Sequence, residues 1–160
     1  MPNNPESIEY LLGRLLMERK ATLATAESCT GGLIAHRLTN APGASAYFLG
    51  GVIAYSNAAK ESMLGAPHKA LEAHGAVSAP VAEALAEGAR ERFGASYGIG
   101  VTGIAGPGGG TPEKPVGLVY IAVAGPDSRD CVSAVFAGGR EEIKAQSAQW
   151  ALELLRNLLR

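Results

Sequence analysis

The sequence predicts an α/β protein: a three-layer α/β/α sandwich with a mixed sheet of about five strands. Apolar residues switch repeatedly along the chain between helical spacing and the short buried runs typical of strands. The link Gly125, Pro126 and Asp127 is too short for a crossover helix, so the strands on either side of it should form an antiparallel hairpin. A length of 160 residues suits one domain, residues 1–160, around a single core.

The first half of the chain is predicted to contain four helices and two strands. Apolar residues between Ile8 and Leu16 recur at helical spacing and indicate an amphipathic helix. Gly50 and Gly51 interrupt the second strand, which is otherwise rich in β-branched and aromatic residues. The expected helices cover residues 5–18, 33–39, 58–64 and 69–74, and the expected strands cover residues 21–26 and 47–55.

The second half is predicted to contain two helices and three strands. Ser78 and Pro80 indicate a helix start, and the apolar face of that helix continues to Phe93. The expected strands cover residues 97–102, 116–124 and 131–137, and a long helix covers residues 140–159. Six residues are expected on the inner face of this last helix: Ile143, Ser147, Trp150, Leu154, Leu155 and Leu158.

Composition narrows the class of protein. A formal net charge of −1 offers no strongly basic face, so nucleic acid is not an expected partner. No segment approaches the run of about 18 to 20 apolar residues that a membrane span requires. Residues 1–10 are polar and do not resemble a signal peptide, and Cys29 and Cys131 lie far apart, which disfavours a disulfide framework. We therefore expect a cytoplasmic protein without a membrane partner.

The first candidate segment for chemistry is the strand-to-helix turn that contains Ser28. Ser28 lies at the carboxyl edge of the predicted sheet, where α/β proteins usually bind ligands. The N–H groups that open the next helix favour an anion or a developing oxyanion, and Gly31 and Gly32 allow close approach to the backbone. In the alternative interpretation, Ser28 or Thr30 only caps the helix.

The second candidate segment runs from Tyr55 to Lys60. A serine hydroxyl is a weak nucleophile and needs a base. The chain has three histidines, but none has a matching acid nearby in the sequence. A lysine can replace histidine if burial lowers its pKa, and Tyr55 and Lys60 are placed to reach the same sheet edge as Ser28. The alternative is that Lys60 is a solvated surface residue.

The third candidate segment is the loop rich in Gly and Pro that begins at Thr102 and Gly103. Successive glycine N–H groups can form an anion-binding nest. The loop is not a Walker loop, because no Gly-Lys-Ser/Thr follows, and it lacks the helix that a Rossmann fingerprint requires. In the alternative interpretation it is only a connector.

Other chemistries have less support in the sequence. Neither a GxSxG nor an SxxK motif surrounds Ser28. Histidines and carboxylates are scattered, so no metal site is expected. Cys29 is a second candidate nucleophile, because a helix N-terminus stabilises a thiolate, although a small buried thiol is the commoner role.

Together and in this order, the three segments resemble the CinA C-terminal domain family, whose members are nicotinamide-nucleotide amidohydrolases. The resemblance extends over nearly the whole chain. The matching stretches are AESCTGG at residues 26–32, YSNAAK at 55–60, HGAVS at 74–78, TGIAGP at 102–107 continuing to EKPVG at 113–117, and FAGGR at 136–140.

The resemblance implies hydrolysis of nicotinamide mononucleotide to nicotinate mononucleotide and ammonia. It implies Ser28 as nucleophile, Lys60 as base and Tyr55 as an assisting group, and it places Thr102 and Arg140 near the site and the substrate phosphate. In that chemistry the N–H groups of Cys29, Thr30, Gly31 and Gly32 are expected to hold the oxyanion, and Gly103 and its loop are expected to contact the phosphate. These two sets of residues form the expected substrate-binding site.

The resemblance also implies a homodimer that needs no metal and no cofactor, with a small-molecule nucleotide as substrate. Larger members of the family carry an N-terminal domain related to molybdopterin binding, which residues 1–160 do not include, so its activities are not expected of this chain. The remaining alternative is a non-catalytic module that binds a nucleotide phosphate, in which Ser28 only donates a hydrogen bond.

Overall fold

The described residues form six α-helices, one short 3-10 helix and five strands. The computed structural model describes residues 4–160, so the first three residues of the predicted domain and of the polar N-terminal segment lie outside the described residues. In chain order the elements are α1 (Ile8–Glu18), β1 (Leu23–Glu27), α2 (Leu33–Thr39), η1 (Ala44–Ala46), β2 (Phe48–Ile53), α3 (Asn57–Leu64), α4 (His68–His74), α5 (Ala79–Phe93), β3 (Tyr97–Gly103), β4 (Leu118–Ala124), β5 (Arg129–Val135) and α6 (Arg140–Leu159).

The five strands form one mixed sheet in the order β2-β1-β3-β4-β5. β1 is parallel to both β2 and β3, whereas β4 is antiparallel to β3 and to β5. The strands β4 and β5 form the hairpin that the short Gly125–Asp127 link predicted. The predicted mixed sheet is therefore confirmed.

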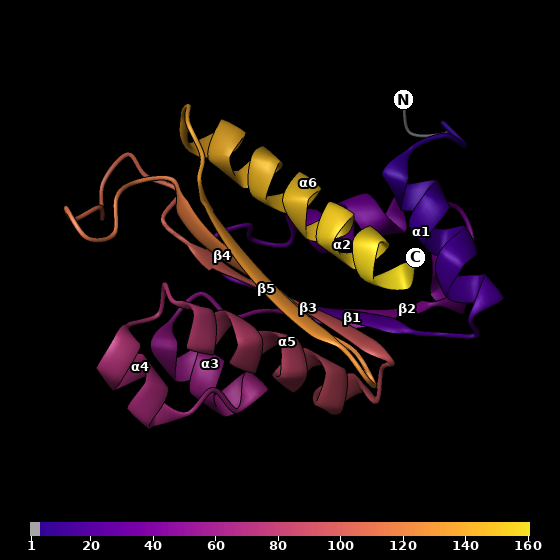
Figure 1. Cartoon of the computed structure of the whole chain (residues 1–160), viewed down its shortest axis with the longest axis horizontal. Coiled ribbons are helices and arrows are strands. Elements are labelled where there is room, and N and C mark those ends of the chain that lie inside the picture. The colour runs from indigo at the N-terminus through magenta and orange to yellow at the C-terminus, as the bar shows by residue number, and fades with distance from the viewer. Residues whose placement is uncertain (1–3) are drawn as a thin grey trace.

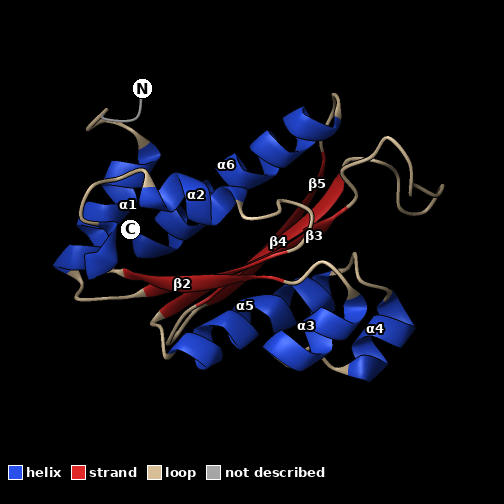
Figure 2. Cartoon of the chain, turned by 180° about the vertical axis from the view of Figure 1, so that it is seen from behind, coloured by secondary structure: helices blue, strands red, loops and turns tan. Residues whose placement is uncertain are grey.

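Helices cover both faces of the sheet. In Figure 1, α1, α2 and α6 lie above the strands and α3, α4 and α5 lie below them, and the view from behind in Figure 2 shows the same two layers. The main hydrophobic core fills the space between the sheet and the first layer, and a second core lies beneath β1 and β2 against α3, α4 and α5. This arrangement confirms the predicted α/β/α sandwich.

The two central parallel strands bring separate candidate segments to one edge of the sheet. All five residues of β1 are buried, as expected for a parallel strand covered on both faces. Glu27 pairs with Val101 at the end of the β1–β3 ladder, and the Ser28 N–H donates to the Val101 carbonyl at 3.1 Å. Ser28, directly after β1, and Thr102, near the end of β3, therefore lie at the same edge of the sheet.

Small residues allow α5 to lie directly on β3. A Cβ at Gly98 would lie 2.1 Å from the Ala86 carbonyl oxygen, and one at Gly100 would lie 2.4 Å from the Ala82 carbonyl oxygen. These contacts leave no room for a side chain on the α5 face of the strand. Ile99 points to the opposite face, into the main core.

Several predicted boundaries shift, and the start of β4 has a clear local cause. β4 begins at Leu118 rather than at residue 116, because Gly117 has a φ of +94° and its N–H donates to the Ile104 carbonyl. β5 begins at Arg129, which pairs with Ala124, so the hairpin is tighter than predicted.

Trp150 was predicted on the inner face of α6, and that prediction is wrong: its side chain is 41% exposed.

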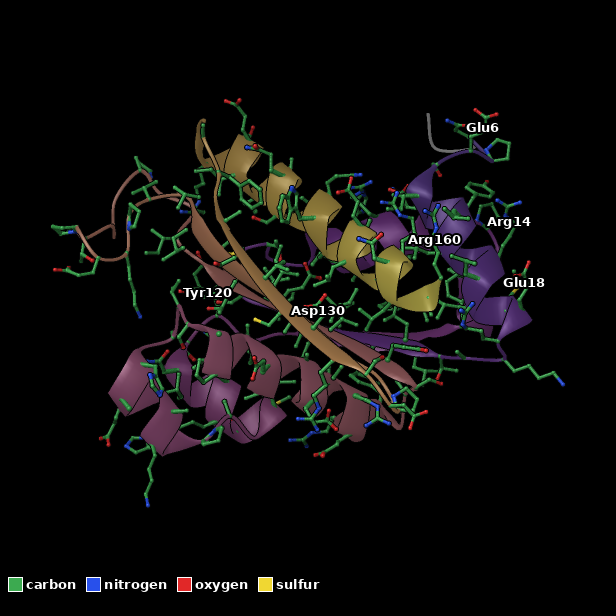
Figure 3. The ribbon with its side chains drawn as sticks, viewed as in Figure 1. Glu6, Arg14, Glu18, Tyr120, Asp130 and Arg160 are labelled. Carbon is green, nitrogen blue, oxygen red and sulfur yellow. The ribbon has the colours of Figure 1, made fainter. Side chains whose placement is uncertain are left out.

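The outer surfaces of the terminal helices carry charged side chains. Figure 3 shows Glu6, Arg14, Glu18 and Arg160 around α1 and the C-terminus, at the end of the molecule opposite the loop between β3 and β4. Within residues 4–160, no helix combines the length and the apolar character needed to span a membrane.

Candidate active site

One cavity brings the three candidate segments together. It has a volume of about 240 Å³ and lies beyond the carboxyl ends of β1 and β3, between the start of α3 and the start of α6. It is lined by Ser28, Cys29, Tyr55, Asn57, Lys60, Ala76, Val77, Thr102, Gly103, Ala105 and Arg140. Arg140 contributes a permanent positive charge and none of these side chains is a carboxylate, so the cavity favours an anionic or electron-rich ligand.

Ser28 is held in place by its backbone while its hydroxyl stays free. The residue is only 7% exposed, and its side chain lines the cavity. Its N–H is bonded to Val101 and its carbonyl accepts from the Gly31 N–H at 3.1 Å. Within residues 4–160 the hydroxyl makes no hydrogen bond, so it is available to a ligand or a base.

Glu27 caps helix α2 in place of Ser28 or Thr30. Its buried carboxylate accepts hydrogen bonds from the Ile34 N–H at 2.8 Å, the Ala35 N–H at 3.1 Å and the Thr30 hydroxyl at 2.7 Å. The interpretation of Ser28 or Thr30 as the cap is therefore wrong. The N–H groups of Ile34 and Ala35 at the start of α2 donate to this carboxylate. These groups therefore do not form the anion site that was predicted at the start of this helix.

The turn before α2 keeps other N–H donors free. Gly31 donates to Ser28, but among the described residues the N–H groups of Cys29, Thr30 and Gly32 have no backbone or side-chain acceptor. Gly31 and Gly32 have φ angles of +60° and +101°, a conformation that L side chains rarely adopt. The tight turn therefore keeps three backbone donors free close to Ser28 in the chain; Cys29 lines the cavity, whereas the predicted site residues Thr30, Gly31 and Gly32 do not.

Lys60 is a buried lysine with one hydrogen bond. The residue is only 2% exposed, and its Nζ donates to the Tyr55 carbonyl oxygen at 3.2 Å. Within residues 4–160 no carboxylate lies within ion-pair distance of its Nζ. Burial lowers the pKa of Lys60 below its usual value, with the nearby Cys29 acting in the opposite direction. The interpretation of Lys60 as a solvated surface residue is therefore wrong.

Tyr55 and Arg140, two residues that line the cavity, form a hydrogen-bonded bridge. The Arg140 Nη2 donates to the Tyr55 hydroxyl at 2.7 Å, and its Nη1 donates to the Gly106 carbonyl at 2.6 Å. Tyr55 is 60% exposed, so its ring lies at the surface. Its backbone carbonyl rather than its phenol contacts Lys60. The bridge joins α6 to both the loop after β3 and the loop after β2.

Thr102 and Gly103, at the end of β3, both line the cavity. The Thr102 hydroxyl donates to the Ala76 carbonyl at 2.8 Å and is buried. It thus ties the end of β3 to the loop between α4 and α5, and the donor capacity of this hydroxyl is already used. Gly103 contributes backbone only, and a Cβ there would lie 2.7 Å from a methyl group of Val119.

Cys29 lines the same cavity but does not have the character of a ready nucleophile. Burial raises the pKa of its thiol to about 11, and the charge of Glu27 acts in the same direction. The helix N-terminus that was expected to stabilise a thiolate is occupied by Glu27. The thiol is therefore protonated at neutral pH.

Four cavity residues were not among the predicted site residues. They are Asn57, Ala76, Val77 and Ala105. All four lie inside the stretches on which the family resemblance rests, at residues 55–60, 74–78 and 102–107. Within residues 4–160 no three His, Cys, Asp or Glu side chains gather into a group that could hold a metal ion.

Known proteins match the chain over nearly all its length. The family model of the CinA C-terminal domain matches residues 5–159. CinA-like proteins from Anaeromyxobacter sp. (strain K) and Koribacter versatilis (strain Ellin345) are 57% and 53% identical over 97% and 98% of this chain. The chain spans only 38% of the length of each of these curated relatives.

Solved structures share the fold. The competence/damage inducible protein CihA from Agrobacterium tumefaciens matches with a TM-score of 0.90 and 42% identity, over 96% of each chain. A competence-damaged protein (CinA) superfamily protein from Klebsiella pneumoniae 700603 matches with a TM-score of 0.92 and 31% identity, over 98% of each chain. Sequence, fold and the motif-bearing cavity agree, and the chain belongs to the CinA C-terminal domain family.

Proposed function

We propose that this chain hydrolyses the carboxamide of nicotinamide mononucleotide to nicotinate mononucleotide and ammonia. The observation that carries the proposal is the buried Lys60, whose pKa is lowered by burial and which shares one cavity with the free hydroxyl of Ser28. A neutral lysine beside a serine is a nucleophile and base pair that needs no histidine. The relatives' names do not state a reaction, so the chemistry is argued from the site and from the family resemblance.

Acylation begins with proton transfer between Ser28 and Lys60. The neutral amine keeps one N–H on the Tyr55 carbonyl, which leaves its lone pair free to accept the Ser28 proton. The Ser28 Oγ then bonds to the carboxamide carbon, and the electron pair of the C=O bond moves to its oxygen. The free N–H groups of Cys29, Thr30 and Gly32 are the donors for that oxyanion.

Collapse of the tetrahedral intermediate releases ammonia. The Lys60 ammonium returns its proton to the departing nitrogen, the C–N bond breaks and an acyl-Ser28 ester remains. Lys60 then takes a proton from water, whose oxygen bonds to the acyl carbon, and Ser28 leaves with that proton. The Tyr55 phenol, which accepts from Arg140, is proposed to support the position of the loop rather than to transfer the proton.

The same proposal assigns the remaining substrate-binding roles. Arg140 and the backbone at Gly103 contact the 5′-phosphate end of the nucleotide, and Thr102 holds the wall of the cavity in place. We further propose that the reaction belongs to pyridine nucleotide recycling in the cytoplasm, and that a homodimer performs it without a cofactor.

Ammonia release from nicotinamide mononucleotide by the purified chain, with and without a chelator, tests the function. Ser28→Ala should abolish turnover, whereas Cys29→Ala should retain a substantial fraction. Loss of turnover in Cys29→Ala alone would transfer the nucleophile to Cys29. If the chain and both variants bind the nucleotide but release no ammonia, the non-catalytic binding module is the better description.

A further inference from the structure

Lys114 ties the long loop between β3 and β4 to the end of α4. Its Nζ donates a hydrogen bond to the carbonyl of His74, the last residue of that helix. The same Nζ lies 3.1 Å from the point that a Cβ on Gly75 would occupy, so the glycine leaves room for the ammonium group. A cation at this end of a helix interacts favourably with the carbonyls of the last turn. Lys114 therefore holds the chain where it leaves α4.

Two further side chains hold the next two carbonyls of the chain. The Ser78 hydroxyl donates to the Gly75 carbonyl at 2.9 Å, and the Thr102 hydroxyl donates to the Ala76 carbonyl at 2.8 Å. Three consecutive carbonyls, at residues 74–76, thus accept hydrogen bonds from side chains of three separate positions in the sequence. Because each peptide group is planar, fixing a carbonyl also fixes the N–H of the residue that follows it.

The segment held in this way forms part of the wall of the candidate active site. Ala76 and Val77 line the cavity that also holds Ser28 and Lys60. Within residues 4–160 the N–H groups of Ala76 and Val77 donate to no backbone or side-chain acceptor. These two N–H groups are therefore available to a ligand, and their direction depends on the bonds that hold the carbonyls before them.

The loop that carries Lys114 reaches the same cavity from its other end. Ala105 lines the cavity, and the Gly106 carbonyl accepts from Arg140 at 2.6 Å. The loop turns at Thr111, whose N–H donates to the Lys114 carbonyl at 2.8 Å and whose hydroxyl accepts from the Lys114 N–H at 3.0 Å. In Figures 1 and 2 this loop extends beyond the sheet on the side where α4 lies. One limb of the loop is thus held by α6 and the other by the end of α4.

We propose that Lys114 is a positioning residue for substrate binding; the inference rests on the proposed function. Lys114 does not line the cavity, so it acts through the His74 carbonyl on the wall that Ala76 and Val77 form. Neither Ala76 nor Val77 has a side chain that can transfer a proton. The wall therefore contributes to binding the substrate rather than to the chemical step.

The mobility of the Ala76 and Val77 amide groups tests the positioning step without any ligand. Lys114→Met removes the donor and keeps the length of the side chain. Nitrogen-15 relaxation should show the two order parameters falling from the value of a rigid backbone, about 0.85, towards about 0.6. Lys114→Arg, which can still donate, should restore them, and the matched control Lys69→Met, at an exposed lysine of α4, should leave them unchanged. Unchanged order parameters in Lys114→Met would overturn the inference.

Turnover supplies the second readout. Lys114→Met should raise the KM for nicotinamide mononucleotide by about 2- to 10-fold, the loss expected for one hydrogen bond, with little change in kcat. Lys114→Arg should return the KM close to the parent value. If the two amide groups loosen but the KM does not change, Lys114 only caps α4 and the inference is overturned. If they loosen and neither the parent nor any variant releases ammonia, the hold of Lys114 on the wall stands and the proposed amidase function fails.

Discussion

Lys60 combines burial with the absence of an acidic partner among the described residues. An ordinary lysine titrates at about 10.4 and would be almost fully protonated at neutral pH. The surroundings of Lys60 disfavour its ammonium form, because the residue is buried and its Nζ has one carbonyl acceptor. These surroundings make it suitable as a base and costly as a structural residue.

The rate of ammonia release should therefore depend on the protonation of Lys60. Since the pKa of Lys60 is lowered, kcat/KM should rise with pH and level off below the pH at which a free lysine titrates. Lys60→Arg keeps the positive charge but cannot lose a proton near neutral pH, so it should be nearly as inactive as Lys60→Ala. A pH–rate profile of the parent and turnover of both variants, with Lys69→Arg as control, measure this.

Two results would contradict the assignment of Lys60 as the base. If Lys60→Arg retained most of the activity, Lys60 would act only through its charge. A profile without a basic limb would mean that another group accepts the proton.

Replacing Lys60 by an apolar residue should stabilise the fold. Each unit by which the pKa of a lysine is lowered in the folded state costs about 1.4 kcal/mol at pH values below the folded-state pKa. That cost disappears as pH rises through the folded-state pKa towards about 10.4. Lys60→Met should therefore raise the melting temperature at pH 7, by about 2–4 °C per kcal/mol, and the difference should shrink towards pH 10. Thermal unfolding over this pH range checks it, and a lower melting temperature at pH 7 would show that Lys60 stabilises the fold.

The turn between β1 and α2 depends on a cap that comes from the strand. Glu27 reaches forward to the N–H groups of Ile34 and Ala35 and leaves the Ser28 hydroxyl free. Sequence spacing did not predict this contact, because a helix cap is usually sought within about three residues of the helix start. The contact forms because Glu27 is buried at the end of the central strand β1, where its carboxylate accepts hydrogen bonds from the start of α2.

Glu27→Ala should destabilise the chain measurably. It leaves the buried N–H of Ile34 and the N–H of Ala35 without their acceptor, at a cost of about 1–3 kcal/mol for each buried donor. Glu27→Gln keeps one acceptor oxygen and should lose less. Urea unfolding of both variants measures the difference. Glu141→Ala, in the first turn of α6, is the control and should change the free energy of unfolding by less than about 1 kcal/mol. Equal stability of Glu27→Ala and the parent would mean that water satisfies the cap.

The sequence pattern predicted the elements better than the contacts between them. The hairpin followed from the three-residue link after Ala124, and the Ser28 turn followed from its place after a buried strand. The pairing of Arg140 with Tyr55 joins residues 85 positions apart in the sequence, so no local pattern encodes it. Trp150 was misplaced because the small residues Ala148 and Ala151, with Leu152, fill the inner face of α6 instead.

The whole chain should unfold as one unit. The main core lies between the sheet and the helices α1, α2 and α6. Loss of any of these helices would expose buried apolar residues of the remaining elements, so they should unfold together. The single tryptophan, Trp150 on α6, packs edge-on against Phe136 and reports on that layer. Its fluorescence and the far-ultraviolet circular dichroism of the whole chain should give the same urea midpoint. Two separate midpoints would contradict the prediction of a single domain over residues 1–160.

The Arg140 bridge has a consequence for the order in which the molecule becomes competent. Ser28 and Lys60 are synthesised before Arg140, whose guanidinium joins the loops after β2 and β3 and belongs to α6. Without α6, its buried residues Ile143, Leu152 and Leu155 are missing, and α1 and α2 alone cover that face of the sheet (Figure 1). Contacts of such long sequence separation form late and slowly during folding. The cavity lining is thus completed only when α6 has docked and has brought Arg140 to the residues that precede it in the chain.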